Sequence, residues 1–313
     1  MKLFRMFAVL LAVVCMTFGG KALAAEDGMQ VFQDAYLPAM DKVQNYHLEL
    51  IFHGPTFQSN LVASGQIGMG GSGVVDGTLS WAYTNTDTNQ TKQNEIPIYA
   101  ERSGNSIVLY GQRNGSWQRE NVLEGLAWIL DAVSANDRAT RMQYAAAVKD
   151  VTVSDVGNGR QSMRILLDGK ALAEMENKAV RERIDSMGDA EKKDATEFLR
   201  YINAALAEND IECTWTIDKE TGKTVTVAAD LTGIMRGYAK AVLEDSYQGQ
   251  ITLTPEETEF LASIGYYYDL QFYLTNMGEA ASQVVIPAAV KRDAKDSNLF
   301  NDIKAEVISV VKK

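Results

Sequence analysis

Cysteine, histidine and basic side chains are scarce in this sequence. Its 313 residues include 2 cysteines, 2 histidines and 30 lysines and arginines, against 41 aspartates and glutamates. An acidic chain repels phosphate backbones, which argues against a nucleic-acid partner. His47 and His53 are six residues apart, and no third ligand at metal-binding spacing accompanies them. We therefore expect no metal and no cofactor.

Motifs of common hydrolases are also missing. The sequence contains no Gly-x-Ser-x-Gly nucleophile elbow and no His-Glu-x-x-His metal helix. We therefore expect a protein that is not an enzyme. A glycosidase-type pair of carboxylates stays open, because acidic residues are plentiful and the sequence does not set their separations.

Residues 1–24 have the pattern of an export signal. Lys2 and Arg5 give the positive start, 7–14 the apolar run, and 22–24 the small-residue cleavage site. The apolar run is too short to span a bilayer, and no later run is long enough. We expect cleavage near Ala25, a periplasmic or secreted protein, and no transmembrane segment after cleavage.

A lipid anchor is not expected at Cys15. Lipoprotein signals carry a small residue before the modified cysteine, whereas Val14 stands there.

After cleavage, 27 basic and 41 acidic residues remain, for a net charge of −14. Cys213 is then the single cysteine, so an internal disulfide is impossible, and its position in an alternating apolar run predicts a buried side chain. We expect residues 25–313 to form one domain, because no Pro-rich or Gly/Ser-rich linker divides them. We also expect a monomer.

The segment 97–120 predicts an antiparallel meander, around which we organise the fold. Asn114-Gly115 is a strong signal for a tight hairpin, and a second turn is expected near Gly104. Strand alternation places Leu109 on one face and Val108 and Tyr110 on the other, so both faces of this sheet should be covered.

Other predicted strands each carry one large apolar face. If the strands form an incomplete barrel, these faces converge on the covering helices, and a gap between them would be an apolar pocket. Complete filling of the space by the helices is the alternative that the sequence leaves open. The candidate cavity residues are Leu79, Trp81, Tyr83, Trp215, Ile217, Val225, Val227, Tyr268, Leu270 and Phe272.

Helices are predicted between the strands from apolar residues at helical spacing. The expected ranges are 29–43, 122–148 in two pieces, 179–208 in two pieces, a helix from Thr254 to about 265, and a C-terminal amphipathic helix at about 298–313. Thr254-Pro255-Glu256-Glu257 has the residues of a capping box. We expect the C-terminal stripe of Leu299, Ile303, Val307 and Val310 to pack on the protein's own sheet, with docking on a partner as the alternative.

The ending Ile286-Pro-Ala-Ala-Val290-Lys-Arg-Asp-Ala294 resembles the Ile-Pro-x-x-Val-x-x-x-Ala element of secreted, LolA-like domains. These are related to the lipoprotein carriers of the outer-membrane sorting pathway and to mycobacterial lipid-binding lipoproteins. The spacing of Tyr99, Leu109-Tyr110 and 114–117 is similar to the middle of those domains. The resemblance implies an α+β fold: a strongly curved antiparallel sheet, or incomplete β-barrel, with helices covering its concave face.

The resemblance also implies a function, and it transfers no catalytic residue. We expect an extracytoplasmic carrier that binds a lipid, an acyl chain or a lipidated protein between the sheet and the helices. The first alternative is an envelope-associated interaction or scaffold domain without a ligand cavity. The second is a hydrolase that acts on glycans or esters. The C-terminal helix after the family-like ending is a departure from the pattern.

Overall fold

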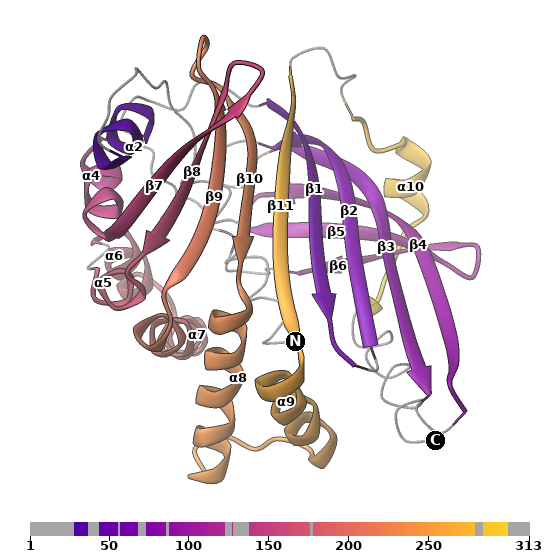
Figure 1. Cartoon of the computed structure of the whole chain (residues 1–313). Helices are drawn as coiled ribbons and strands as arrows, with labels where there is room; N and C mark the ends of the chain where they lie inside the picture. Colours follow the sequence, from indigo (N-terminus) through magenta and orange to yellow (C-terminus); the bar gives the residue numbers. More distant parts are fainter. Residues whose placement is uncertain are drawn as a thin grey trace.

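The structure, a computed structural model, describes residues 28–36, 44–55, 57–67, 73–85, 88–122, 127, 138–175, 178–278 and 284–299. One sheet of twelve strands runs through them, with helices beside it and below it in Figure 1. The strands are β1 (Gln44–His53), β2 (Phe57–Ile67), β3 (Val74–Asn85), β4 (Gln90–Ser103), β5 (Ser106–Arg113), β6 (Ser116–Asn121), β7 (Val148–Gly157), β8 (Arg160–Leu167), β9 (Ile211–Asp218), β10 (Thr224–Asp230), β11 (Asp269–Gly278) and β12 (Lys295–Asp296).

The sheet is open and mixed. Its order is β12-β6-β5-β4-β3-β2-β1-β11-β10-β9-β8-β7, so β12 and β7 are its two edges. All pairs are antiparallel except β12 with β6, where Lys295 lies opposite Gln118 in a parallel ladder. The prediction of a purely antiparallel sheet is wrong at this edge, because β12 follows helix α10 and is not joined to β6 by a hairpin.

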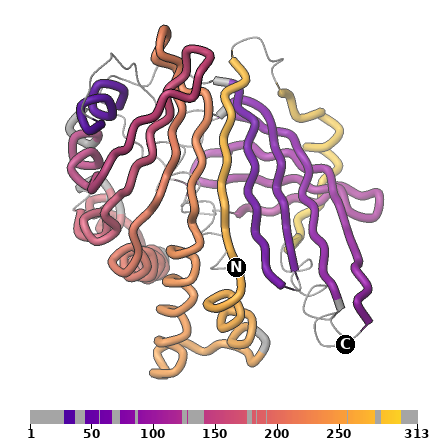
Figure 2. Tube along the Cα trace, in the orientation of Figure 1, coloured from indigo at the N-terminus to yellow at the C-terminus, as the bar shows by residue number. Residues whose placement is uncertain are grey.

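The curvature of the sheet is concentrated at β4. This strand pairs with β3 over Gln90–Glu101 but with β5 only over Ile98–Ser103. Strands β5 and β6 consequently run across behind β1–β4 (Figures 1 and 2). Pro97 directly precedes the part of β4 that pairs with β5, so its missing N–H removes no hydrogen bond to that strand.

Glycine permits close packing of two adjoining strands. A Cβ on Gly77 of β3 would lie 2.0 Å from the backbone oxygen of Val62 on β2. Gly65 on β2 has φ +151°, which L side chains rarely adopt. No larger residue fits at Gly77 without moving one of these strands.

The helices form three groups in space. Helices α2, α4, α5, α6 and α7 lie beside β7–β10, α8 and α9 extend below β10 and β11, and α10 lies on the far side of the sheet near β5 and β6 (Figure 1). The bounds are α2 (Gly28–Tyr36), α4 (Arg138–Ala146), α5 (Gly169–Glu174), α6 (Lys178–Asp185), α7 (Asp189–Glu208), α8 (Thr232–Tyr247), α9 (Pro255–Tyr267) and α10 (Ala288–Asp293).

Several predicted helix features are confirmed. Helix α9 begins with the predicted capping box, in which the Glu257 amide donates to Thr254 Oγ1 and the Thr254 amide to Glu257 Oε2, both at 3.2 Å. The predicted break in 179–208 occurs between α6 and α7. The predicted signal at 1–24, residues 37–43, most of 123–137 and residues 300–313 lie outside the described residues.

The family-like ending forms an anchor on the outer face of the meander. Ile286 and Val290, 5 % and 4 % exposed, pack with Val108 and Tyr110, and Ala294 joins the same cluster. Leu109 packs on the opposite face of β5. The prediction that both faces of this strand are covered is therefore confirmed.

Candidate functional site

The inner face of the sheet carries two apolar clusters. The larger, here called the helix-packed core, joins β1 and β8–β11 to α2, α7, α8 and α9. The smaller, here called the floor, lies on β3–β5 and consists of Leu79, Trp81, Ile96, Ile98 and Leu109, each at most 7 % exposed. Phe57 and Leu61 of β2 pack against both clusters, so the apolar surface is continuous across β2.

Strand register brings the floor together. Leu79 lies opposite Ile96 of β4 and opposite Leu61 of β2. Residues directly opposite each other in antiparallel strands point to the same face, with Cβ atoms about 5 Å apart. Among the described residues buried in this cluster, Leu299 is the member that does not belong to a strand.

The structure does not bring the ten residues predicted to line a cavity together in one cluster. Trp215, Ile217, Val227, Tyr268, Leu270 and Phe272 belong to the helix-packed core, and Leu79 and Trp81 belong to the floor. Tyr83, 3 % exposed, follows Trp81 on the same strand face. Val225 is half-buried, because a bulge at 224–226 turns Thr224 inward in its place.

Two buried donors at one end of the floor have no hydrogen-bond partner among the described residues. Trp81 Nε1 and the Tyr83 hydroxyl are shielded from solvent, and no described residue forms a hydrogen bond with either. The indole of Trp215 in the helix-packed core differs, since it donates to Thr224 Oγ1 at 3.1 Å. Buried polar atoms in proteins are almost always hydrogen-bonded. At this end of the floor, two buried donors therefore lie side by side on one strand face without a partner among the described residues.

Polar residues flank these donors on the neighbouring strands. Lys92 of β4 lies opposite Tyr83, and Asn94 lies opposite Trp81. On the other side, Ser59 of β2 lies opposite Trp81. Lys92 is exposed, whereas Leu79 and Ile96 are buried. The inner face of β3 and β4 thus changes from apolar to polar to cationic along the strands.

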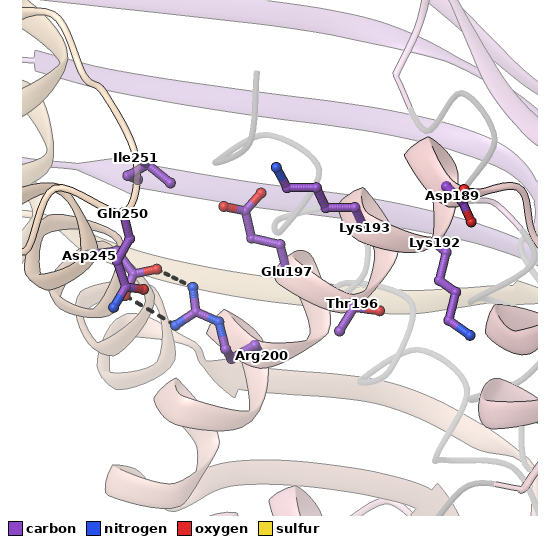
Figure 3. Close-up of a pocket in the computed structure, with 9 residues that line it drawn as sticks. All are labelled: Asp189, Lys192, Lys193, Thr196, Glu197, Arg200, Asp245, Gln250 and Ile251. Atoms are coloured by element: carbon purple, nitrogen blue, oxygen red, sulfur yellow. Dashed lines mark hydrogen bonds and ion pairs between the residues drawn. The ribbon is translucent and has the colours of Figure 1, made fainter.

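A hollow with charged walls lies on α7 and the end of α8. Its volume is about 430 Å³, and Figure 3 shows the residues that line it. They are Asp189, Lys192, Lys193, Thr196, Glu197, Arg200, Asp245, Gln250 and Ile251. Lys193 and Glu197 extend from the same side of α7, while Arg200 reaches Asp245 (Figure 3).

The Asp245 carboxylate is the centre of a polar network between two helices. It is 6 % exposed and accepts from Arg200 Nη1 at 3.1 Å, from Arg200 Nη2 and from the Tyr201 hydroxyl at 2.8 Å. Burial, together with the bond to Asp245, raises the pKa of Tyr201 above its usual range. These contacts engage Arg200 and Asp245 in joining α7 to α8, so the hollow is a weaker candidate for a ligand site than the floor.

The histidines and the cysteine have structural surroundings. His47 lies between the Ser64 hydroxyl at 2.9 Å and Glu49 at 3.1 Å, and His53 is exposed at the end of β1. Within the described ranges, no group of three or more His, Cys, Asp or Glu side chains is arranged to hold a metal ion. Burial raises the pKa of the Cys213 thiol to about 12, and Cys213 lies in the helix-packed core as predicted. No helix in the described part of the chain is both long and apolar enough to cross a membrane.

The sequence-based list missed three floor residues. Ile96 and Ile98 alternate across Pro97, which obscured a strand that runs from Gln90. Leu109 was placed on a strand face but not in a cavity. The alternation of Ile96 and Ile98 was the available signal. Trp81 and Tyr83 have no hydrogen-bond partner among the described residues because of three-dimensional packing, which no local sequence pattern indicates.

Comparison with known proteins gives no family. No family model matches the chain, and no curated protein matches it. Among solved structures, one match is a porin-like protein from Bacteroides uniformis, at 8 % identity, covering 76 % of this chain and 96 % of that chain. Its TM-score is 0.18, too low to support any argument about fold or function.

Proposed function

We propose that this protein is an extracytoplasmic carrier that binds an apolar ligand, such as a lipid, an acyl chain or the acyl groups of a lipidated protein, on the floor. The floor supports this proposal because its five apolar side chains form a cluster of their own, which adjoins the helix-packed core across β2. An open, strongly curved sheet with helices on its inner face also fits the half-barrel of the LolA-like carriers that the sequence resembles.

The energetics of the floor suit an alkyl chain. Burial of apolar surface contributes about 25 cal/mol per Å², or about 0.8 kcal/mol for each methylene group. A chain of ten methylenes could therefore gain several kcal/mol on the floor, enough to offset the loss of freedom on binding. Specificity for chain shape should be weak, because such contacts have no direction.

Ligand capture and a pair of matched variants test this proposal. We expect native mass spectrometry of protein made in bacteria to show bound lipid, and a fluorescent fatty acid to be displaced by other acyl ligands. Leu109 and Val108 are adjacent, are 7 % and 9 % exposed, and lie on opposite faces of β5. Leu109→Ala should weaken binding by about 3- to 10-fold, since it removes floor surface. Val108→Ala, a comparable loss on the outer face, should leave affinity unchanged.

The absence of bound lipid together with the absence of probe binding would overturn the carrier proposal. Equal effects of the Leu109 and Val108 variants would show that the floor is not the site. Turnover of ester or glycan substrates would favour the hydrolase alternative, and it is checked with the same preparation.

An interaction role is the second candidate function. Tyr266 and Tyr267 at the end of α9 are 77 % and 63 % exposed, and their rings lie 6.2 Å apart. Exposed tyrosines are enriched where proteins bind one another. A double Tyr266→Ser, Tyr267→Ser variant that binds acyl probes normally but loses a protein partner would favour this role.

A further inference from the structure

We propose that the ligand of the floor carries an acyl oxygen, and that Trp81 Nε1 and the Tyr83 hydroxyl donate hydrogen bonds to it. This inference rests on the proposed carrier function and adds the chemistry of the ligand's polar end. An alkyl chain would lie along Leu79, Ile96 and Leu109. Its carboxylate or ester carbonyl would lie at Trp81 and Tyr83.

The spacing of the two donors suits one acceptor group. Trp81 and Tyr83 are two residues apart on β3, so their Cα atoms are about 7 Å apart and their side chains leave the same face. Both side chains are 3 % exposed, and neither donor has a partner among the described residues. A carbonyl or carboxylate oxygen can accept two hydrogen bonds, so a single acyl group could satisfy both donors.

The side chains around the donors favour an acceptor and not a donor. Indole N–H can only donate, so Trp81 cannot pair with an ammonium or guanidinium group. Lys92, opposite Tyr83 and exposed on the same face, adds a positive charge at this end of the floor. Positive charge favours an anionic head, and a charge-assisted hydrogen bond is stronger than a neutral one. The expected order of affinity is therefore carboxylate first, ester second and hydrocarbon last.

Burial of the donors has a consequence for the unliganded protein. Replacing an unpaired buried polar group by an apolar group of similar shape is neutral or stabilising. Tyr83→Phe, which removes only the hydroxyl, should consequently leave the denaturation midpoint unchanged or raise it. A donor that served the fold, for example through a bound water, would give the opposite result.

Three probes with the same fluorophore and chain length test the inference: 1-pyrenedecanoic acid, its methyl ester and 1-decylpyrene. In the wild-type protein, the acid and the ester should bind at least about tenfold more tightly than the hydrocarbon. Tyr83→Phe should weaken binding of the acid and the ester by about 5- to 30-fold, with hydrocarbon binding unchanged. Trp81→Phe also removes floor surface, so it should weaken binding of all three probes, and of the acid and the ester more than of the hydrocarbon. Lys92→Met should weaken binding of the acid alone, which distinguishes a free carboxylate from an ester.

Tyr110→Phe is the matched control, because Tyr110 is a buried tyrosine on the outer face of the same sheet. It should leave the affinities of all three probes unchanged. If all three probes bind equally well to wild type and to both Phe variants, the carrier function stands and the inference is wrong. If Tyr83→Phe lowers the denaturation midpoint without changing the preference among probes, the Tyr83 hydroxyl serves the fold, and the inference is also wrong. Binding of none of the probes would instead remove the carrier function itself.

Discussion

Trp81 and Trp215 both lie buried on the inner face, but their surroundings separate a candidate ligand contact from a core residue. Trp215 is packed by the Phe32 ring, edge to face at 6.4 Å between centroids, and its indole N–H has a partner in Thr224. Trp81 has a comparable apolar environment, and its indole N–H has no partner among the described residues. The indole nitrogen distinguishes the two residues. Its removal from Trp215 breaks a hydrogen bond to Thr224, whereas its removal from Trp81 breaks none among the described residues.

Cys213 gives a prediction at the residue scale. In a chain that begins at Ala25 it is the single thiol. Because Cys213 is buried and the pKa of its thiol is raised to about 12, native protein at pH 8 should react with a disulfide reagent at least ~10³-fold more slowly than unfolded protein. Stopped-flow absorbance with and without denaturant measures both rates.

The same pKa shift sets a direction for stability against pH. An unfolded thiol ionises near pH 8.5, whereas the folded thiol stays neutral up to about pH 12. The free energy of unfolding should therefore fall as pH rises through this interval, because only the unfolded state gains by ionising. Cys213→Ala should remove this part of the pH dependence. Fast native labelling, independent of denaturant, would contradict the burial on which both expectations depend.

At the scale of elements, α10 is held by three apolar side chains and an ion pair between Lys291 and Glu101 of β4 at 2.6 Å. It has six residues, too few to form an isolated stable helix, so its position depends on these tertiary contacts, chiefly on the burial of Ile286 and Val290. The Ile-Pro-x-x-Val-x-x-x-Ala spacing places those three apolar groups on one side. The segment therefore functions as a clamp on the outer face of the meander.

A matched pair of neighbours tests this clamp. Ile286 is 5 % exposed, and the adjacent Val285 is 73 % exposed. Ile286→Ala should lower the free energy of unfolding by about 2–4 kcal/mol. Val285→Ala should change it by less than about 0.5 kcal/mol. Urea denaturation measures both variants, and limited proteolysis should show earlier cleavage near α10 in the first. Similar stabilities of the two variants would show that the ending is not anchored on β5.

The sequence predicted elements best where a pattern repeats locally. Alternation in Tyr268, Leu270 and Phe272 predicted the buried face of β11, and Asn114-Gly115 predicted the turn between β5 and β6, where both residues have positive φ. The sequence-based prediction failed where pairing with a distant strand decides which side chains point inward. The bulge that turns Thr224 inward at the expense of Val225 depends on β9, and the parallel pairing of β12 depends on α10. Neither effect has a signal within the segment itself.

For the whole molecule, the sequence indicated an open sheet with inner helices but not the division of its inner face. The ten candidate residues look like one apolar surface in the sequence, because each strand has a similar alternation of apolar residues. Packing divides them, since helices α2, α7, α8 and α9 cover one part of the sheet and the floor lies on the other. Which strand faces meet helices depends on the order of strands in the sheet, and that order is set by long-range pairing such as β1 with β11.

An open sheet has two edges, and both are protected against pairing with another chain. Edge strands are a template for association unless they are short or charged. Strand β12 has two residues, and β7 carries exposed charges at Lys149, Asp150 and Asp155. Static light scattering of the wild-type protein should therefore give the mass of a monomer.

Asp150→Val with Thr152→Val places β-branched apolar residues on the β7 edge and should cause concentration-dependent association. Glu212→Val with Thr214→Val makes equivalent changes on β9, which is already paired on both sides by β8 and β10, so this variant should stay monomeric. Association of both variants would assign the effect to surface hydrophobicity in general, and association of neither would show that charge on β7 does not protect the edge.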